Sequence, residues 1–394
     1  MLNKNLFVKI TYLLFYFFFI NISVFSQQKI IVGAEQIDKY LDLIQNKNVA
    51  IVCNQTSVFN NSVKKTHLVD SLIKLKIKVV KVFSPEHGFK GNADNGEYIN
   101  DEIDSKTKIK IISLYGKKRK PSKSDLNNID IVLFDIQDVG VRFYTYLSTL
   151  HYVMEACAES NKKLIILDRP NPNIHYVDGP IMKSENKSFL GLHPVPIVYG
   201  MSIGEYAKMI NGEKWLSNKI KCNLRVIPNS NYFRNSKYIL PIRPSPNLPN
   251  KTSINLYPSL CLLEQTPVSV GRGTEMQFQI YGHPLFQKTK FSFIPKSNYG
   301  AKNPKLKNQI CYGVNLKDDN EISQIKLEWL INSYNQFPHK EDFFYPNFNK
   351  ISGSNQLQNQ IIKGLSEKEI KNTWISDLNN FKKIRKKYLI YSNK

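Results

Sequence analysis

The sequence lacks the motifs that mark common nucleotide and metal sites. No Gly-x-Gly-x-x-Gly follows the first predicted strand, which runs instead into Cys53-Asn54-Gln55-Thr56, so a dinucleotide site is not predicted. A Gly-x-x-x-x-Gly-Lys-Ser phosphate loop is also missing. The seven histidines show no His-Glu-x-x-His spacing, which argues against a zinc hydrolase. No cofactor and no metal site are predicted.

Closely spaced cysteines are absent as well. The chain has five cysteines and no Cys-x-x-Cys pair, and an odd number excludes complete pairing. Several lie in apolar runs, so we expect buried free thiols, with one disulfide as the alternative. The five are Cys53, Cys157, Cys222, Cys261 and Cys311.

Acidic residues are few, with 32 Asp and Glu against 55 Lys and Arg, which gives a net charge of +23. The basic residues are scattered through the chain and do not interleave with aromatic residues as in single-stranded nucleic-acid binders. The charge therefore favours acidic substrates weakly and predicts no nucleic-acid partner.

The first 26 residues have the pattern of a secretory signal peptide. Lys4 and Lys9 form a basic start, Ile10–Ile20 is an apolar run, and Val24-Phe25-Ser26 suits a cleavage site. The run is short for a membrane span, and an uncleaved anchor is the alternative. We expect export to the periplasm or the extracellular space, with no membrane contact after cleavage.

Strands alternate with helical segments over 27–240, which predicts a Rossmann-like, mostly parallel sheet domain of the α/β class. The predicted strands are Val49–Cys53, Val79–Phe83, Ile109–Leu114, Ile131–Phe134, Leu164–Leu167 and Leu224–Ile227. The predicted helices are Leu68–Leu75, Tyr146–Ser160 and a helix to Asn211 that opens with a capping box at Ser202–Glu205. Residues 88–107 read as a long ordered loop.

A smaller α+β domain is predicted for 241–394. Its start is rich in proline, which makes helix unlikely there and marks a crossing between domains. Those prolines are Pro241, Pro244, Pro246, Pro249 and Pro258. Short strands follow, with helical stretches near Glu321–Asn335 and Leu378–Lys387.

Polar side chains follow four predicted strands or turns. In a parallel sheet the carboxyl ends lie on one edge, so these groups are expected to converge. They are Asn54-Gln55-Thr56, Glu86-His87, Asp135-Gln137-Asp138 with Arg142, and Asp168-Arg169-Asn171. Taken singly, each is as well explained by a cap, a turn or a surface ion pair. Carboxylates, arginines, aromatics and asparagines together suit a sugar substrate.

Gly271-Arg272-Gly273 adds an arginine whose flanking glycines let the backbone approach a ligand, although a turn with a solvated arginine is the common explanation. With the segments above, it completes a resemblance to one family, the exo-acting β-N-acetylmuramidases of the NamZ type, which are bacterial enzymes of peptidoglycan turnover. The resemblance covers about 30 to 390. It rests on Ser84–Gly88, Asp135–Tyr146, Leu167–Pro172, Pro244–Pro249 and Gly271–Thr274.

The resemblance implies a Rossmann-like N-terminal domain, a smaller C-terminal domain and a cleft between them. It also implies release of N-acetylmuramic acid from the non-reducing ends of peptidoglycan fragments such as MurNAc-GlcNAc. The chain departs from the family at Glu264-Gln265-Thr266-Pro267, where many members read Glu-Gly-Thr-Asn, and at Val270, where some have Glu.

On this hypothesis Glu86 is the general acid that protonates the leaving oxygen, and His87 tunes or orients it or is simply a hydrogen-bonded turn residue. Glu264, or failing it Asp138, is the second carboxyl or orients the 2-acetamido group. Arginine suits the lactyl carboxylate, and the candidates are Arg142, Arg169 and Arg272. The other predicted substrate-binding residues are Asn54, Gln137, Tyr144, Asp168, Asn171 and Asn247.

Two alternatives stay open. A non-catalytic muropeptide-binding protein on the same fold would keep the arginines and aromatics without needing a proton-donating carboxyl. An esterase or amidase acting on the same polymer is weaker, since it needs a nucleophilic Ser or Cys or a metal site.

Overall fold

The computed structural model describes residues 28–393 except 62–63, 95 and 319–320. The predicted signal peptide, residues 1–26, lies outside the described residues. Residues Ile31–Lys394 form one compact unit, to which the following refers. The proposed boundary between residues 240 and 241 stays a prediction. In the described part of the chain, no helix is long and apolar enough to cross a bilayer.

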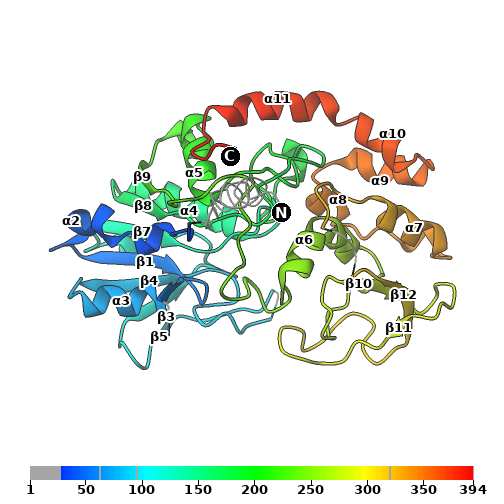
Figure 1. Cartoon of the computed structure of the whole chain (residues 1–394), viewed down its shortest axis with the longest axis horizontal. Coiled ribbons are helices and arrows are strands. Elements are labelled where there is room, and N and C mark those ends of the chain that lie inside the picture. Colours follow the sequence, from blue (N-terminus) through cyan, green and yellow to red (C-terminus); the bar gives the residue numbers. More distant parts are fainter. Residues whose placement is uncertain (1–27, 62–63, 95, 319–320, 394) are drawn as a thin grey trace, which may run out of the picture. The chain divides into compact units, whose positions relative to one another are not determined.

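A seven-stranded sheet forms the first half of this unit (Figure 1). Its order is β5-β6-β4-β1-β7-β8-β9, and every neighbouring pair is parallel except β5 and β6. The chain winds outward from β1 through β4 to β6, then returns beside β1 and winds out through β8 to β9, which is the doubly wound Rossmann order. The predicted α/β fold class is confirmed. The strands are β1 Val49–Cys53, β4 Val79–Ser84, β5 Glu102–Ile103, β6 Lys110–Ser113, β7 Ile131–Asp135, β8 Lys163–Leu167 and β9 Asn223–Ile227.

Both faces of the sheet are covered, and the central strands are apolar on both sides as a result. In β1, Val49, Ile51 and Cys53 belong to the core beneath α2 and α3, whereas Ala50 and Val52 belong to the core beneath α4 and α5. The elements around the sheet are α2 Leu41–Ile44, β2 Val58–Asn61, β3 Lys64–His67, α3 Leu68–Lys74, α4 Tyr146–Glu159 and α5 Ile203–Gly212. The predicted strands and helices of this half are confirmed to within a residue or two; β5 is a short edge strand inside the predicted loop.

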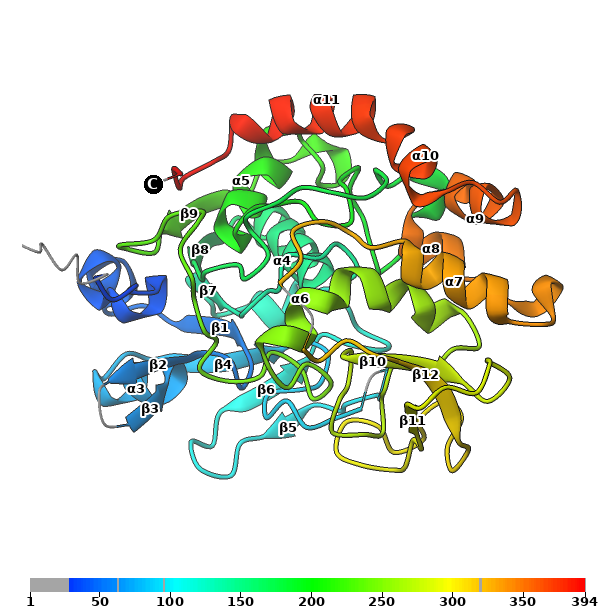
Figure 2. The ribbon, with the colours of Figure 1, turned by 45° about the vertical axis from the view of Figure 1, so that its right-hand side comes forward.

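The second half combines a small antiparallel sheet, of order β10-β12-β11, with six helices among the described residues (Figure 2). Helix α11 runs back from these helices toward α5 (Figure 1). The elements are α6 Lys251–Leu260, β10 Ile280–His283, β11 Ser292–Phe293, β12 Cys311–Asn315, α7 Glu328–Gln336, α8 Phe348–Ser352, α9 Asn355–Ile362, α10 Glu367–Asn372 and α11 Ile375–Lys386. Of these helices only α7 and α11 were predicted, and the short strands were predicted without bounds.

The proline-rich stretch was predicted to be an unlikely place for a helix, and this is wrong at its end, where α6 contains Pro258. Proline lacks the N–H that normally binds the carbonyl four residues earlier, here that of Ile254. The Asn173 side chain donates to that carbonyl instead (3.1 Å), so the gap in the ladder is filled from another part of the chain. Asn250 caps the first turn by accepting from Ser253 N (2.9 Å).

Arg142 joins the two halves. It is 1% exposed, and its Nη1 donates to the carbonyl oxygens of Pro180 and Val195 (2.9 and 2.8 Å). Its Nη2 donates to those of Ile351 and Ser352, at the end of α8 (2.9 and 2.7 Å). One guanidinium thus satisfies four buried carbonyls from two distant segments.

We expect Arg142→Met to lower the free energy of unfolding by about 3 kcal/mol or more, because it leaves these carbonyls without donors. Guanidinium denaturation followed by circular dichroism measures the change. The exposed Arg225→Met is the control and should stay within about 0.5 kcal/mol of the wild type. An Arg142→Met protein as stable as that control would contradict the assigned role.

Candidate active site

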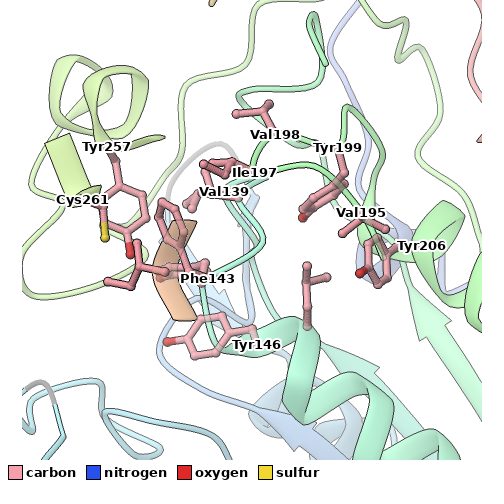
Figure 3. Close-up of a cluster of buried hydrophobic side chains, with 14 of the residues drawn as sticks. Val139, Phe143, Tyr146, Val195, Ile197, Val198, Tyr199, Tyr206, Tyr257 and Cys261 are labelled. Carbon is pink, nitrogen blue, oxygen red and sulfur yellow. The ribbon is translucent and has the colours of Figure 1, made fainter. Parts of the chain in front are cut away.

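A cavity of about 820 Å³ lies beyond the carboxyl end of β4 and is lined by segments from both halves of the chain. Phe143, Tyr146, Tyr257 and Cys261 form part of its wall and continue into a buried cluster that includes Tyr199 (Figure 3). The predicted site residues that line the cavity are Glu86, His87, Tyr144, Asn247, Glu264 and Arg272. Groups separated by nearly 190 residues of sequence therefore share one space.

Glu86 follows β4 in the turn Pro85–Gly88 and is 5% exposed. Its Oε2 accepts from Thr145 Oγ1 (2.6 Å), and its Oε1 accepts from Gly96 N (3.1 Å). Tyr115 lines the cavity close to this carboxylate, and burial followed by the Glu86 charge raises the pKa of the phenol. Glu86 is thus held by two hydrogen bonds at the wall of the cavity.

His87 stands beside Glu86 in a left-handed conformation (φ 68°), which non-glycine residues adopt infrequently. Its Nδ1 lies 2.8 Å from the carbonyl oxygen of Ala93 and must carry the proton, because a carbonyl only accepts. Burial lowers the pKa of His87, although the Glu86 charge and the Ala93 carbonyl oppose this shift. The ring is therefore neutral at neutral pH and leaves Nε2 as an acceptor.

Glu264 lies in the 3-10 helix Cys261–Gln265 and binds Arg272 through both oxygens. Arg272 Nε lies 3.1 and 3.0 Å from the two oxygens, and Nη2 lies 2.6 Å from Oε2. Burial raises the pKa of Glu264, but the charge and hydrogen bonds of Arg272 outweigh it, so the net pKa is lowered. Glu264 is ionised and its charge is balanced.

Asn247 lines the cavity and carries a buried acceptor that no described residue satisfies. Its Nδ2 donates to the carbonyl oxygen of Gly300 (2.7 Å), while its buried Oδ1 has no hydrogen-bond partner among the described residues. A buried acceptor without a donor is costly, so a ligand that supplies an N–H or O–H would gain from binding there. Tyr144, next along the wall, donates to the carbonyl oxygen of Pro244 (2.8 Å).

The other predicted site residues lie behind the cavity and do not line it. Asn54 Nδ2 donates to Tyr146 OH (2.9 Å) and so positions a residue of the wall. Gln137 Nε2 donates to the carbonyls of Asp138 and Pro170, and Asn171 Nδ2 donates to that of Met201. Arg169 is buried in a two-point ion pair with Asp135 (2.5 and 2.9 Å). Arg142 is occupied by four carbonyls, as described above.

The switch point between β1 and β7, where Rossmann folds usually bind ligands, is filled by side chains. Ser57 Oγ donates to the carbonyl oxygen of Asp135, and Gln137 N donates to Thr56 Oγ1 (3.0 Å). The cavity lies to one side of this point, at the end of β4.

Asp138 and Asp168 are fully buried carboxyls, and burial raises the pKa of each to about 6. Asp138 Oδ2 accepts from Gly140 N (2.7 Å) and Tyr199 OH, whereas its Oδ1 has no partner among the described residues. Asp168 Oδ2 accepts from Ser202 Oγ and Tyr391 OH (both 2.6 Å), which ties the chain's last turn to the sheet.

Gly200–Gly204 has the spacing Gly-x-Ser-x-Gly of a serine-hydrolase elbow, a signal that the sequence carries. The structure gives Ser202 another role. Its φ of −73° is unstrained, it caps α5, and its Oγ is engaged by Glu205 N and Asp168. The predicted capping box is confirmed. Ser202 is fully buried and is not a nucleophile at this cavity.

Several lining residues were missed from the sequence, among them Tyr115, Arg119, Thr145, Phe189, Lys302 and Lys305. Thr145 lies within a motif noted above, but nothing in its spacing marked it. Lys305 donates to the carbonyls of Glu264 and Val268 (both 3.2 Å), and burial lowers its pKa to about 8. All five cysteines are buried and free, as predicted. Among the described residues, no group of three or more His, Cys, Asp or Glu side chains could hold a metal ion.

Two protein-family models match nearly the whole described chain. "Exo-beta-N-acetylmuramidase NamZ, N-terminal" matches residues 49–252, and its C-terminal counterpart matches residues 255–391. The chain belongs to the NamZ exo-β-N-acetylmuramidase family. The resemblance seen in the sequence is confirmed.

Relatives support the assignment to NamZ. The peptidoglycan β-N-acetylmuramidase NamZ of Bacillus subtilis (strain 168) is 36% identical over 374 residues, which is 89% of each chain. Two crystal structures of DUF1343 family proteins from Bacteroides fragilis NCTC 9343 are similar throughout. One has a TM-score of 0.86 at 46% identity and covers 93% of this chain and 100% of its own. The other has a TM-score of 0.76 at 27% identity and covers 92% and 99%.

For this NamZ-family chain we expect Asp138→Asn to flatten the pH dependence of stability. The pKa of Asp138 in the folded state, about 6, lies above the ordinary value of 3.8, so folding favours the protonated carboxyl. Its contribution to the free energy of unfolding is complete below about pH 4 and is lost as the pH rises through 6. A pKa shift of about two units corresponds to a loss of about 2–3 kcal/mol in the free energy of unfolding between pH 4 and 7. Urea unfolding across this range measures it. The control Asp377→Asn, at an exposed site, should show the same change of stability with pH as the wild type. If Asp138→Asn also showed that change, Asp138 would not be its source.

Proposed function

We propose that this chain is an exported exo-acting glycoside hydrolase that releases N-acetylmuramic acid from the non-reducing end of peptidoglycan fragments, with Glu86 as general acid. The observation that carries the proposal is the Glu86 carboxyl, held at the wall of the cavity by Thr145 and Gly96. Membership of the NamZ family supports the substrate class.

The surroundings of Glu86 suit a group that gives up a proton and takes it back. The Thr145 hydroxyl can donate to a carboxylate or accept from a carboxylic acid, so it serves both states. His87 is neutral and places no positive charge beside the acid. Arg272 is paired with Glu264, and Glu86 has no cationic partner among the described residues.

Glu264 is the second carboxyl of the proposal. Its lowered pKa keeps it ionised, so it can stabilise the positive charge that develops at the anomeric carbon. Asp138 does not line the cavity, which favours Glu264 over it. The two proposed catalytic glutamates have different partners, as acid and base require: Glu86 has hydroxyl and amide donors, and Glu264 has a guanidinium.

The cavity suits an amino sugar. Its volume lies within the usual range for small-molecule sites. The unpaired Oδ1 of Asn247 can accept from the acetamido N–H, and aromatic residues line the cavity where a sugar ring would lie. Signal-peptide cleavage before Gln27 would deliver the enzyme to cell-wall material, namely muropeptides such as MurNAc-GlcNAc, with no nucleic-acid partner and no membrane contact.

We expect residues 27–394 to release free N-acetylmuramic acid from MurNAc-β-1,4-GlcNAc, and Glu86→Gln to lower the rate by about 10²-fold or more. Mass spectrometry follows the product, and Glu185→Gln, at an exposed carboxyl outside the cavity, is the control. If Glu86→Gln releases N-acetylmuramic acid at the wild-type rate, the chain is still a hydrolase but Glu86 is not its general acid. Tight binding without release by the wild type would favour the non-catalytic binding protein.

Substrates with different leaving groups distinguish the role of the general acid, Glu86, from that of the second carboxyl, Glu264. A nitrophenyl leaving group needs little protonation, so Glu86→Gln should recover most of the lost kcat on the nitrophenyl β-glycoside of N-acetylmuramic acid. Glu264→Gln should lose about 10²-fold or more on both substrates, because its charge acts on the sugar and not on the leaving group. Equal losses on both substrates in Glu86→Gln would argue against the acid role.

A further inference from the structure

The buried arginines of this chain are already occupied. Arg142 binds four carbonyls, and three others are paired with carboxylates, which leaves little capacity for a ligand. Those pairs are Arg169 with Asp135, Arg234 with Glu205, and Arg272 with Glu264. An anionic group on the substrate must therefore find its partner elsewhere.

Arg119 is differently placed. It lines the cavity and is exposed, and the described residues offer its guanidinium no hydrogen bond and no ion pair. Its Cζ lies 4.6 Å from the centroid of the Phe189 ring, so one face of the guanidinium rests on an aromatic surface. The N–H edge stays open, which is the edge that binds carboxylates at two points.

Phe189 is a rigid support. Ser148, on α4, donates to its carbonyl oxygen (2.8 Å), and Ser188 and Gly191 exchange backbone hydrogen bonds across it (3.0 and 2.9 Å). Its ring also stacks on Tyr152, with centroids 6.3 Å apart and planes 10° apart. The stacking restricts the arginine before any ligand arrives, which lowers the entropy cost of binding.

Phe189 and the proposed general acid, Glu86, line the same cavity, and Tyr115 lies between them. The ring centroids of Tyr115 and Phe189 lie 5.9 Å apart, and Tyr115 and Glu86 line the same cavity, close enough for the Glu86 charge to raise the pKa of the phenol. One tyrosine thus separates Arg119's aromatic support from the Glu86 carboxyl. The two lysines of the lining are committed, Lys302 to Glu97 and Lys305 to backbone carbonyls.

We propose that Arg119 binds the lactyl carboxylate of the muramoyl residue and so selects muramic acid over glucosamine. This rests on the proposed function, since it places the muramoyl unit in the Glu86 cavity. The lactyl ether is the group in which muramic acid differs from glucosamine, and an uncommitted guanidinium on the wall is the matching receptor.

The test compares Arg119→Gln and Arg119→Lys with the wild type, using calorimetry with N-acetylmuramic acid, its lactyl methyl ester and N-acetylglucosamine. Arg225→Gln, an exposed arginine on β9 outside the cavity, is the charge-matched control. Arg119→Gln should weaken N-acetylmuramic acid about 10- to 100-fold and leave the ester and N-acetylglucosamine unchanged. Arg119→Lys should recover part of the loss. On MurNAc-GlcNAc the KM should rise by a similar factor with kcat little changed.

Three results would overturn the proposal. Wild-type affinity of Arg119→Gln for N-acetylmuramic acid, with hydrolysis by the wild type intact, would refute the Arg119 assignment alone. Equal loss for all three ligands would do the same, since it would indicate a structural role. A wild type that neither binds nor hydrolyses any muramic acid compound would instead refute the proposed function, and this assignment with it.

Discussion

The structure depends on one requirement, that a charge taken out of water must have a partner. Buried arginines meet it with carboxylates or carbonyl oxygens from distant parts of the chain, and in doing so they hold the two halves together. Arg142 links the loops above the sheet to α8, and Arg234 Nε also donates to the carbonyl of Tyr391 near the C-terminus (3.1 Å). Charged groups that have such partners stabilise the fold, whereas charged groups without them are available for binding and catalysis.

The charged groups Glu86, Asp94 and Arg119 line the cavity and have no oppositely charged partner among the described residues. Glu86 is held by hydroxyl and amide donors and has no cationic partner, and Arg119 rests on an aromatic ring. Glu264 and Arg272 neutralise each other nearby, so they add an ionised carboxylate without adding net charge. Because hydrogen bonds fill the usual switch point between β1 and β7, the site lies at the end of β4, where the Rossmann sheet meets the second half.

The strands of the sheet and the position of Glu86 at a strand end could be predicted from the sequence. Hydrophobic runs indicate strands, and the proline and glycine that follow them mark where the strands end. The sequence was insufficient wherever a residue's role depends on a distant partner. Pro258 lies in a helix because Asn173 replaces the missing hydrogen bond. Arg142 and Arg169 looked like ligand-binding arginines, and only the fold reveals that carbonyls and Asp135 occupy them. Arg119 was missed because it lies in a run of four basic residues, Lys117–Lys120, none of which the sequence distinguishes from the others. Its aromatic support comes from Phe189, 70 positions later in the chain.

The most direct test of this account is a crystal structure of the Glu86→Gln variant with MurNAc-β-1,4-GlcNAc bound. The account predicts the muramoyl unit inside the cavity, with the glycosidic oxygen within about 3 Å of the residue 86 side chain. It also predicts the lactyl carboxylate at the guanidinium of Arg119. A disaccharide bound outside the cavity, or with its glycosidic oxygen out of reach of residue 86, would contradict it.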